Sequence, residues 1–275
     1  MISFPNAKIN LGLYITKKRK DGFHEIKSIM VPSGPKDILE FVPSKDGREH
    51  FSLSGLDLES PGNDNLVIKA LHNVRKLHAI PPLKIHLHKN IPFGAGLGGG
   101  SADAAFMIKM LNEHFGLEFS RQDLMKIASE TGSDCTFFIN NEASLVSGKG
   151  DQINPVEWKI PPLHLVLLFP EIKISTPEAY RGIVPAIPGE SIIDIVENPP
   201  DQWRNTLFND FESVMFPPYP FLRELKEKLY KNGAVYASMS GSGSAIYGLF
   251  KDKPDLPEEL RKFIIHEGPI IAKNS

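Results

Sequence analysis

The segment Pro92-Phe-Gly-Ala-Gly-Leu-Gly-Gly-Gly-Ser101 decides how this chain is interpreted, because five of the seven residues from Gly94 to Gly100 are glycine. A strand pattern over 83–87 precedes it, and a helical pattern over 101–115 follows it. Glycine permits a positive φ and lets the main chain approach another group closely. A helix N-terminus adds unpaired N–H donors and a partial positive charge. The segment therefore predicts a loop that wraps an anion such as a phosphate.

Two common kinds of phosphate loop do not fit this segment. A P-loop needs a lysine after its last glycine, and none follows Gly99 or Gly100. Gly94-x-Gly96-x-x-Gly99 is spelled like the dinucleotide fingerprint, which requires a strand–loop–helix–strand unit. Here the helix is followed by a second helix over 120–131, which opens with a capping box at 120–123. We therefore expect a nucleoside triphosphate cradle of another kind.

Residues 7–15 alternate with a period of two, which predicts a half-buried strand. Ile9, Leu11 and Leu13 point toward the core, so Lys8 and Asn10 lie side by side on the opposite, non-core face. Neighbouring polar side chains on such a face are either exposed edge-strand residues or parts of one site.

Periodicity and turn residues predict a mixed α+β chain. We expect further strands at 24–31, 37–42, 50–54, 83–87, 143–147, 163–169, 234–239, 245–250 and 269–272. Further helices are expected at 63–78 (capped by Asn63 or Asp64), around 221–229 and at 257–265, with a short buried segment at 135–139 and a proline-rich loop at 185–200. A domain boundary is expected at 150–162, where prolines precede an apolar strand.

The composition excludes several classes of protein. The chain has 275 residues, a formal charge of −2 and 41% hydrophobic residues, so it is neither disordered nor basic enough to attract nucleic acid. Cys135 is the only cysteine, which rules out an intrachain disulfide and fits a reducing compartment. The longest apolar stretch, 165–170, is far shorter than the ~20 residues of a membrane span, and the N-terminus has no signal-peptide pattern. We expect a cytoplasmic protein with no nucleic acid or membrane partner.

Three smaller features of the sequence each have both a structural and a functional interpretation. Ser240-Gly-Ser-Gly-Ser244 is either a hairpin turn or the second half of one site that uses both glycine loops. Asp134 follows a predicted helix end, so it belongs to a terminating turn or is a carboxylate aimed into a cleft. His86 and His88 have a spacing that suits a metal, but no third ligand accompanies them, so no metal site is predicted.

Taken together, these segments resemble the GHMP kinase superfamily. Its three motifs match in order, at Ala7-Lys-Ile-Asn-Leu11, at 94–105 and at 239–250. Within the superfamily, the residues around Arg19–Glu25, Gly132–Asp134 and Ser175–Tyr180 are similar to those of the members that phosphorylate a cytidyl diphosphate methylerythritol. Two departures stand out: Phe23 where those members more often have tyrosine, and Cys135-Thr136 where they have Val-Pro.

The resemblance implies a two-domain α+β fold. Residues 1–155 would form an ATP-binding domain like ribosomal protein S5, and 156–275 a ferredoxin-like domain. It also implies transfer of the γ-phosphoryl group of ATP, with Mg²⁺, to the 2-hydroxyl of the cytidyl diphosphate substrate, giving ADP, in the non-mevalonate route to isoprenoid precursors. It implies no oligomeric state.

The resemblance also assigns roles to residues. Asp134 would be the catalytic base, and Lys8 would keep it ionised and stabilise negative charge on the acceptor oxygen. The substrate would contact Asn10 and Thr176, stack between Phe23 and Tyr180, and hydrogen-bond His24 through its cytosine. ATP would be held by residues of the glycine-rich segment and one helix residue: Pro92, Phe93, Gly94, Ala95, Gly96, Leu97, Gly98, Gly99, Gly100, Ser101, Ala102 and Asn65.

Some of these roles have a structural alternative. Ser101 is either a Mg²⁺ ligand or only a helix N-cap, and Asn65 lies near adenine or is only a first-turn helix residue. Two other functions also stay open. A kinase for another small alcohol would lack the cluster of Phe23, His24 and Tyr180, and a non-catalytic nucleotide-binding protein would lack Lys8 or Asp134; all are present.

Overall fold

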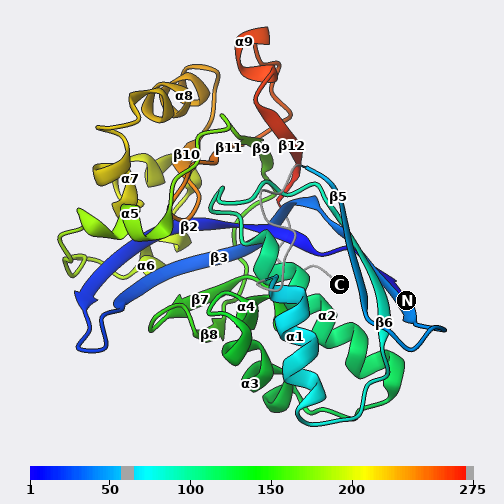
Figure 1. Ribbon diagram of the computed structural model, residues 1–275. Coiled ribbons are helices and arrows are strands. Elements are labelled where there is room, and N and C mark those ends of the chain that lie inside the picture. The colour runs from blue at the N-terminus through cyan, green and yellow to red at the C-terminus, as the bar shows by residue number, and fades with distance from the viewer. Residues whose placement is uncertain (57–64, 271–275) are drawn as a thin grey trace. The chain divides into compact units, whose positions relative to one another are not determined.

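The computed structural model describes residues 1–56 and 65–270 (Figure 1). The chain forms two compact units, which we describe separately. The first unit comprises Met1–Ala7, Pro35–Phe93 and Gly98–Asn141; the second comprises Lys8–Gly34, Gly94–Leu97 and Glu142–Ser275. The chain passes between the units several times, and the simple division at 155/156 stays a prediction.

The first unit contains a four-stranded sheet in the order β1-β4-β6-β5. Strand β4 is antiparallel to β6, whereas β5 runs parallel to it. The strands predicted near 37–42, 50–54 and 83–87 are thereby confirmed. The bounds are β1 Ile2–Ser3, β4 Ile38–Pro43, β5 His50–Gly55 and β6 Leu83–Lys89.

The described residues of this unit also form helices α1 Leu66–Arg75, α2 Gly99–Phe115, α3 Arg121–Thr131 and α4 Cys135–Asn140. Helix α2 is its central helix, and α1 lies beside it (Figure 1). Ala102, Ala104 and Ala105 of α2 are fully buried, and their small side chains let neighbouring helices come close. Helix α3 follows α2 directly, which confirms the argument against a dinucleotide fold.

The helix caps agree with the sequence in one case and correct it in another. Ser120 and Asp123 form the predicted capping box of α3. The N-cap of α1 is Asn65, whose side chain accepts from the N–H of Val67; the caps proposed for it, Asn63 and Asp64, lie outside the described residues.

The second unit contains two four-stranded sheets, in the orders β2-β3-β7-β8 and β10-β11-β9-β12. Strands β2 and β3, in blue, are the longest (Figure 1); the first residues of β2 and the last of β3 belong to the first unit. The bounds are β2 Asn6–Lys18, β3 His24–Lys36, β7 Ser144–Ser147, β8 Gln152–Pro155, β9 His164–Leu168, β10 Tyr236–Met239, β11 Ile246–Phe250 and β12 Ile264–Pro269.

Short helices fill the rest of the second unit. Helix α8 packs on β10 and β11 through Leu222, Leu225 and Leu229, as its apolar stripe predicts. The bounds are α5 Thr176–Arg181, α6 Ile192–Glu197, the 3₁₀ helix η1 Pro200–Asn205, α7 Asp210–Met215, α8 Pro220–Lys231 and α9 Glu258–Arg261.

Sequence reasoning missed the short helices α5 and α7 and was wrong in three further places in this unit. The predicted loop at 185–200 contains α6, whose six residues are too few for periodicity to reveal. The helix predicted to reach 265 ends at Arg261, because Ile264–Pro269 pair with β9. The final strand is therefore at 264–269 rather than 269–272; residues 271 and 272 lie outside the described part.

Strand β2 also departs from its prediction, since it is buried on both faces rather than half-buried. Lys8 is 3% exposed and Asn10 is 1% exposed. Burying an ammonium group is costly unless hydrogen bonds replace its water, so this strand needs polar partners inside the protein.

None of the helices in the described residues is both long and apolar enough to cross a membrane.

Candidate active site

The glycine-rich segment leads into α2 through Gly98, which is the N-cap of the helix with φ +72°. Helix α2 therefore begins at Gly99, not at the predicted Ser101, and Ser101 lies inside the first turn. The alternative role of Ser101 as N-cap is thus wrong. Burial raises the pKa of the Cys135 thiol to about 12, and the hydroxyl of Ser101 opposes this rise by a smaller amount.

The glycines of the segment serve two different purposes. A Cβ on Gly99 would lie 2.8 Å from Ile91 Cγ2, and one on Gly96 would lie 1.9 Å from the carbonyl oxygen of Ser240. These two glycines are required by protein packing. A Cβ on Gly94 would meet nothing within 4 Å, and one on Gly100 only Leu66 Cδ1 at 3.8 Å. At these two positions the bare backbone borders open space, where a phosphate can approach.

The residues between the glycines anchor the segment. Ala95 and Leu97 are each 1% exposed, whereas Phe93 is 80% exposed; Pro92 is buried, and Ala102 lies in the core of α2. The buried side chains of Ala95 and Leu97 thus fix the backbone of the segment on both sides of Gly96.

Asp134 lies where α3 ends and α4 begins, in the first unit. It is the N-cap residue of α4, with a half-buried side chain that makes no capping hydrogen bond. Lys69 of α1 donates to the carbonyl oxygen of Thr131 across 2.7 Å at the end of α3. Asp134 therefore belongs to a turn that ends a helix, and its half-buried carboxylate is not used as a cap; that it is aimed into a cleft stays a prediction.

Lys8 lies on β2, in the second unit, where its ammonium group is fully engaged. Lys8 Nζ donates to Asn10 Oδ1 at 2.5 Å and to the carbonyl oxygen of Gly96 at 2.8 Å. Asn10 in turn donates to Ser28 Oγ at 2.8 Å. The two neighbours predicted on one face of the strand do interact, and they hold a buried cation against the glycine-rich segment.

The second glycine cluster packs on the first. Ser240 Oγ donates to the carbonyl oxygen of Gly96 at 2.9 Å. The backbone N–H of Ala245 donates to the carbonyl oxygen of Ala95 at 3.1 Å. The cluster at 240–244 is therefore the turn of the β10–β11 hairpin, and it also packs on the glycine-rich segment, while the use of both loops by one site stays a prediction.

Sequence reasoning missed Asn209, which shapes this second loop. Its side-chain amide donates to the carbonyl oxygens of Met239 (2.7 Å) and Gly241 (2.9 Å), and its oxygen caps α7. The only signal in the sequence is an asparagine at a helix start, which by itself predicts no more than a cap.

The predicted substrate residues also lie in the second unit. The rings of His24 and Tyr180 are stacked, with centroids 4.7 Å apart and planes 19° apart. Tyr180 makes an edge contact with buried Phe211 at 4.9 Å. Burial, and secondarily Lys18, lowers the pKa of His24, so this ring is neutral near pH 7 and presents both a donor and an acceptor nitrogen.

Phe23 and Thr176 lie differently. Phe23 is 57% exposed, with Lys149 Nζ 5.4 Å from its ring centroid. Thr176 begins α5, and its hydroxyl lies 3.5 Å from that of Ser242 in the second glycine loop. The structure therefore brings His24 and Tyr180 together and places Thr176 near the second glycine loop, while Phe23 is exposed.

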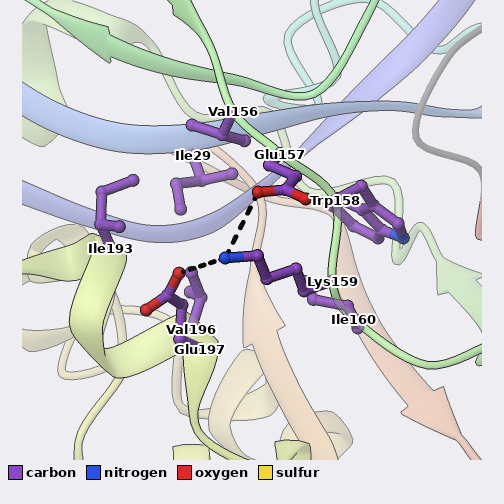
Figure 2. A pocket seen from close by; sticks show the side chains of 9 residues that line it. All are labelled: Ile29, Val156, Glu157, Trp158, Lys159, Ile160, Ile193, Val196 and Glu197. Atoms are coloured by element: carbon purple, nitrogen blue, oxygen red, sulfur yellow. Dashed lines mark hydrogen bonds and ion pairs between the residues drawn. The ribbon is translucent and has the colours of Figure 1, made fainter.

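Two cavities of the second unit are lined by none of the predicted site residues. One, of about 240 Å³, has apolar walls that include Ile29 and Trp158, with Lys159 between Glu157 and Glu197 at its rim (Figure 2). The other, of about 570 Å³, is lined by Tyr14, Phe208 and other residues. The candidate site is thus defined by its loops and not by either cavity.

The remaining candidates have structural partners. Asn65 uses its oxygen to cap α1, which leaves its amide group for another role. His86 and His88 hydrogen-bond the hydroxyls of Ser52 and Ser54 on the neighbouring strand. Within residues 1–56 and 65–270, three or more His, Cys, Asp or Glu side chains nowhere gather as a metal would require.

Two family models match segments of this chain. The models of the GHMP kinases N terminal domain and the GHMP kinases C terminal domain match residues 65–142 and 192–267. The 4-diphosphocytidyl-2-C-methyl-D-erythritol kinase of Parabacteroides distasonis is 47% identical over 259 residues, which are 94% of this chain and 95% of that protein. The protein of the same name from Bacteroides thetaiotaomicron is 46% identical over 260 residues, 94% of this chain and 95% of that one.

Solved structures give the same result. A 4-(cytidine 5'-diphospho)-2C-methyl-D-erythritol kinase structure superposes with a TM-score of 0.82 and 28% identity, covering both chains completely. Homoserine kinase from Cytophaga hutchinsonii, at 18% identity, has a TM-score of 0.62 over 96% of this chain and 92% of its own, which shows the shared fold alone. The predicted two-domain α+β fold and kinase activity are confirmed: the chain belongs to the GHMP kinases and, among them, to the 4-diphosphocytidyl-2-C-methyl-D-erythritol kinase family.

Proposed function

We propose that this protein transfers the γ-phosphoryl group of ATP to the 2-hydroxyl of 4-diphosphocytidyl-2-C-methyl-D-erythritol, giving the 2-phosphate and ADP in the non-mevalonate route. The observation that carries the proposal is the buried Lys8 ammonium, held on the carbonyl oxygen of Gly96. A buried cation fixed to a phosphate loop suits phosphoryl transfer, which depends mainly on positioning and charge stabilisation. The names of the family relatives supply the acceptor.

In this proposal Asp134 accepts the proton of the acceptor hydroxyl and Lys8 stabilises the charge that develops on its oxygen. The half-buried carboxylate at the start of α4 is not occupied by capping, so it can accept a proton. Lys8 is already ordered by Asn10 and Gly96, so it needs little reorganisation as charge develops.

ATP is proposed to lie on the glycine-rich segment. The open backbone at Gly94 and Gly100 fits phosphate oxygens, and the first-turn N–H groups of α2 supply donors. Asn65 is proposed to contact adenine. Mg²⁺ would neutralise phosphate charge when bound, with Ser101 as a candidate ligand. ATP as donor also favours a cytoplasmic location.

The cytidyl group is proposed to bind at the aromatic residues of the second unit. Cytosine would stack on Phe23 and Tyr180, and the neutral ring of His24 would hydrogen-bond its edge. Asn10, which accepts from Lys8, and Thr176, whose hydroxyl lies near that of Ser242 in the second glycine loop, would contact the polar remainder of the substrate.

A coupled assay of ADP release tests this function with four acceptors: the cytidyl substrate, homoserine, mevalonate and galactose. We expect turnover with the cytidyl substrate and little with the others. Turnover with homoserine or mevalonate instead would favour a kinase for a smaller alcohol. ATP binding without turnover of any acceptor would favour a non-catalytic nucleotide-binding protein.

A further inference from the structure

A buried cluster of three charged side chains lies in the first unit, outside the residues assigned above. Lys89 Nζ, at the end of β6, donates to Asp37 and to Asp103 Oδ2, the latter at 2.6 Å. The side chains of Lys89, Asp37 and Asp103 are 5%, 0% and 3% exposed. Charged groups are rarely buried this deeply unless they form ion pairs with one another, so the placement of this cluster calls for an explanation.

The cluster connects the two ends of the glycine-rich segment. On one side, Asp37 Oδ1 accepts from the backbone N–H groups of Asn90 (2.6 Å) and Ile91 (2.8 Å), directly before the segment. On the other side, Asp103 lies in the second turn of α2, directly after it. Lys89 joins the two carboxylates.

The same cluster also limits the space around the start of α2. A Cβ on Gly99 would lie 3.3 Å from Lys89 Nζ, so the first turn of the helix sits directly against the ammonium group. We call the link from Asp37 through Lys89 to Asp103 the Lys89 bridge. The position of the first-turn N–H donors is thus set by the length of this bridge.

The charges of the cluster depend on one another. Burial alone would lower the pKa of Lys89, but the two carboxylates outweigh it and raise that pKa. Burial raises the pKa of Asp103, and Asp103 Oδ1 has no hydrogen-bond partner in the described structure. Losing either carboxylate therefore leaves the ammonium group poorly compensated, and the bridge loses its geometry.

We propose that Asp37, Lys89 and Asp103 are positioning residues that set the span of the glycine-rich segment and thereby the affinity for the ATP phosphates. This proposal rests on the proposed function, in which that segment binds ATP. It adds three residues that reach the nucleotide only through the backbone they hold.

The test compares Asp37→Asn and Asp103→Asn with a matched control, Glu49→Gln. Glu49 lies in the same unit and likewise bonds a cation, Arg75 at 2.5 Å, and a backbone N–H, that of Leu83 at 3.0 Å. Leu83 starts the strand that Lys89 ends, so the control alters a similar interaction far along β6 from the glycine-rich segment.

Isothermal titration with the ATP analogue AMP-PNP and Mg²⁺ measures nucleotide affinity, and steady-state kinetics give the Michaelis constants of ATP and acceptor. We expect both cluster variants to bind AMP-PNP at least about tenfold more weakly, as for a loss of about 1.4 kcal/mol. The Michaelis constant of the acceptor should change less than about twofold, and Glu49→Gln should leave nucleotide affinity unchanged while lowering the melting temperature. A merely structural cluster would lower stability without this selective loss.

Folded cluster variants that bind AMP-PNP as the wild type does would overturn the proposal. If Asp37→Asn and Asp103→Asn fail to fold, Lys89→Arg decides, because it keeps the charge but lengthens the bridge; nucleotide affinity should fall, and an unchanged affinity would likewise overturn the proposal. Wild-type protein that does not bind AMP-PNP would instead contradict the proposed function itself.

Discussion

The ammonium group of Lys8 and the side-chain hydroxyl of Ser240 both donate to one carbonyl oxygen, that of Gly96, at 2.8 Å and 2.9 Å. The two donors come from chain segments more than two hundred residues apart. A single peptide group of the glycine-rich segment is therefore fixed by a strand residue and by the second glycine loop. Changing Lys8 should affect both charge stabilisation and the shape of this segment.

Lys8→Met should lower kcat by about 10²–10³-fold, because the acceptor oxygen loses its cation. Nucleotide affinity should fall only several-fold, since Ser240 still holds Gly96. Stopped assays and AMP-PNP titration measure the two effects. Lys27→Met, on an exposed position of β3, is the control and should behave as the wild type. A Lys8→Met enzyme with kcat within about twofold of the wild type would remove Lys8 from the reaction.

Gly96→Ala and Gly94→Ala form a matched pair. Both glycines have a positive φ, +76° and +68°, so each alanine costs about 1–2 kcal/mol of backbone strain. Only the Cβ at Gly96 also collides with the carbonyl oxygen of Ser240, at 1.9 Å. Gly96→Ala should therefore lose far more stability in urea unfolding, or not fold. Equal losses in the two variants would show that the packing of the two glycine loops is not important.

The fold was largely predictable, because long strands and amphipathic helices leave periodic patterns. Strand β2 was found from its alternation, but its second buried face was not. Hydrophobic periodicity assigns Lys8 and Asn10 to the non-core face, and only the folded chain shows that this face is buried and that Gly96 and Ser28 replace the water. The short helices α5 to α7 were missed, because six residues are less than two turns.

The chemistry of the site was predictable where residues lie in one motif and unpredictable where they meet through folding. The glycine loops were recognised from their composition, but their contact at Gly96 and Ser240 was only one of two alternatives. The cluster of Asp37, Lys89 and Asp103 had no local signal at all, because its members come from three separate segments and look like ordinary surface charges in the sequence.

Tyr180→Ala should weaken the binding of the acceptor substrate without weakening the binding of ATP. Loss of one stacking face costs about 1–3 kcal/mol per base, so the Michaelis constant of the cytidyl substrate should rise about 5- to 150-fold. The constant for ATP should hardly change. His24→Ala should act in the same direction, since the base edge loses its hydrogen bonds. Equal changes for ATP and acceptor would point to a folding defect, and an unchanged acceptor constant would contradict the proposed cytidyl site.

Lys109→Met should stabilise the protein in a pH-dependent way. Burial lowers the pKa of Lys109 to about 8, although its ammonium lies 3.8 Å from the Phe106 ring centroid and donates to the carbonyl oxygen of Phe138. The unfolded chain holds this proton up to about pH 10.4, so the charge costs the native state up to about 3 kcal/mol below pH 8 and nothing above about pH 10.4.

The lost ring contact and hydrogen bond offset part of this gain, which leaves about 1 kcal/mol of stabilisation at pH 7. Urea unfolding at pH 7, 8, 9 and 10 measures it, with Lys126→Met on the exposed face of α3 as the control. The gain should shrink steadily as the pH rises from 8 to 10. A gain that stays constant over this range, or appears equally in the control, would refute the buried-charge explanation.

The most direct test of the central claim is ³¹P NMR of a reaction that contains ATP, Mg²⁺ and 4-diphosphocytidyl-2-C-methyl-D-erythritol, run with the wild type and with Asp134→Asn. The wild type should produce one new phosphomonoester for each ADP formed, with the phosphate on the 2-hydroxyl. Asp134→Asn should form product at least about 10²-fold more slowly, because it lacks the proton acceptor, while it still binds AMP-PNP. Wild-type protein that forms no phosphomonoester, or an Asp134→Asn variant that forms it at the wild-type rate, would contradict the account.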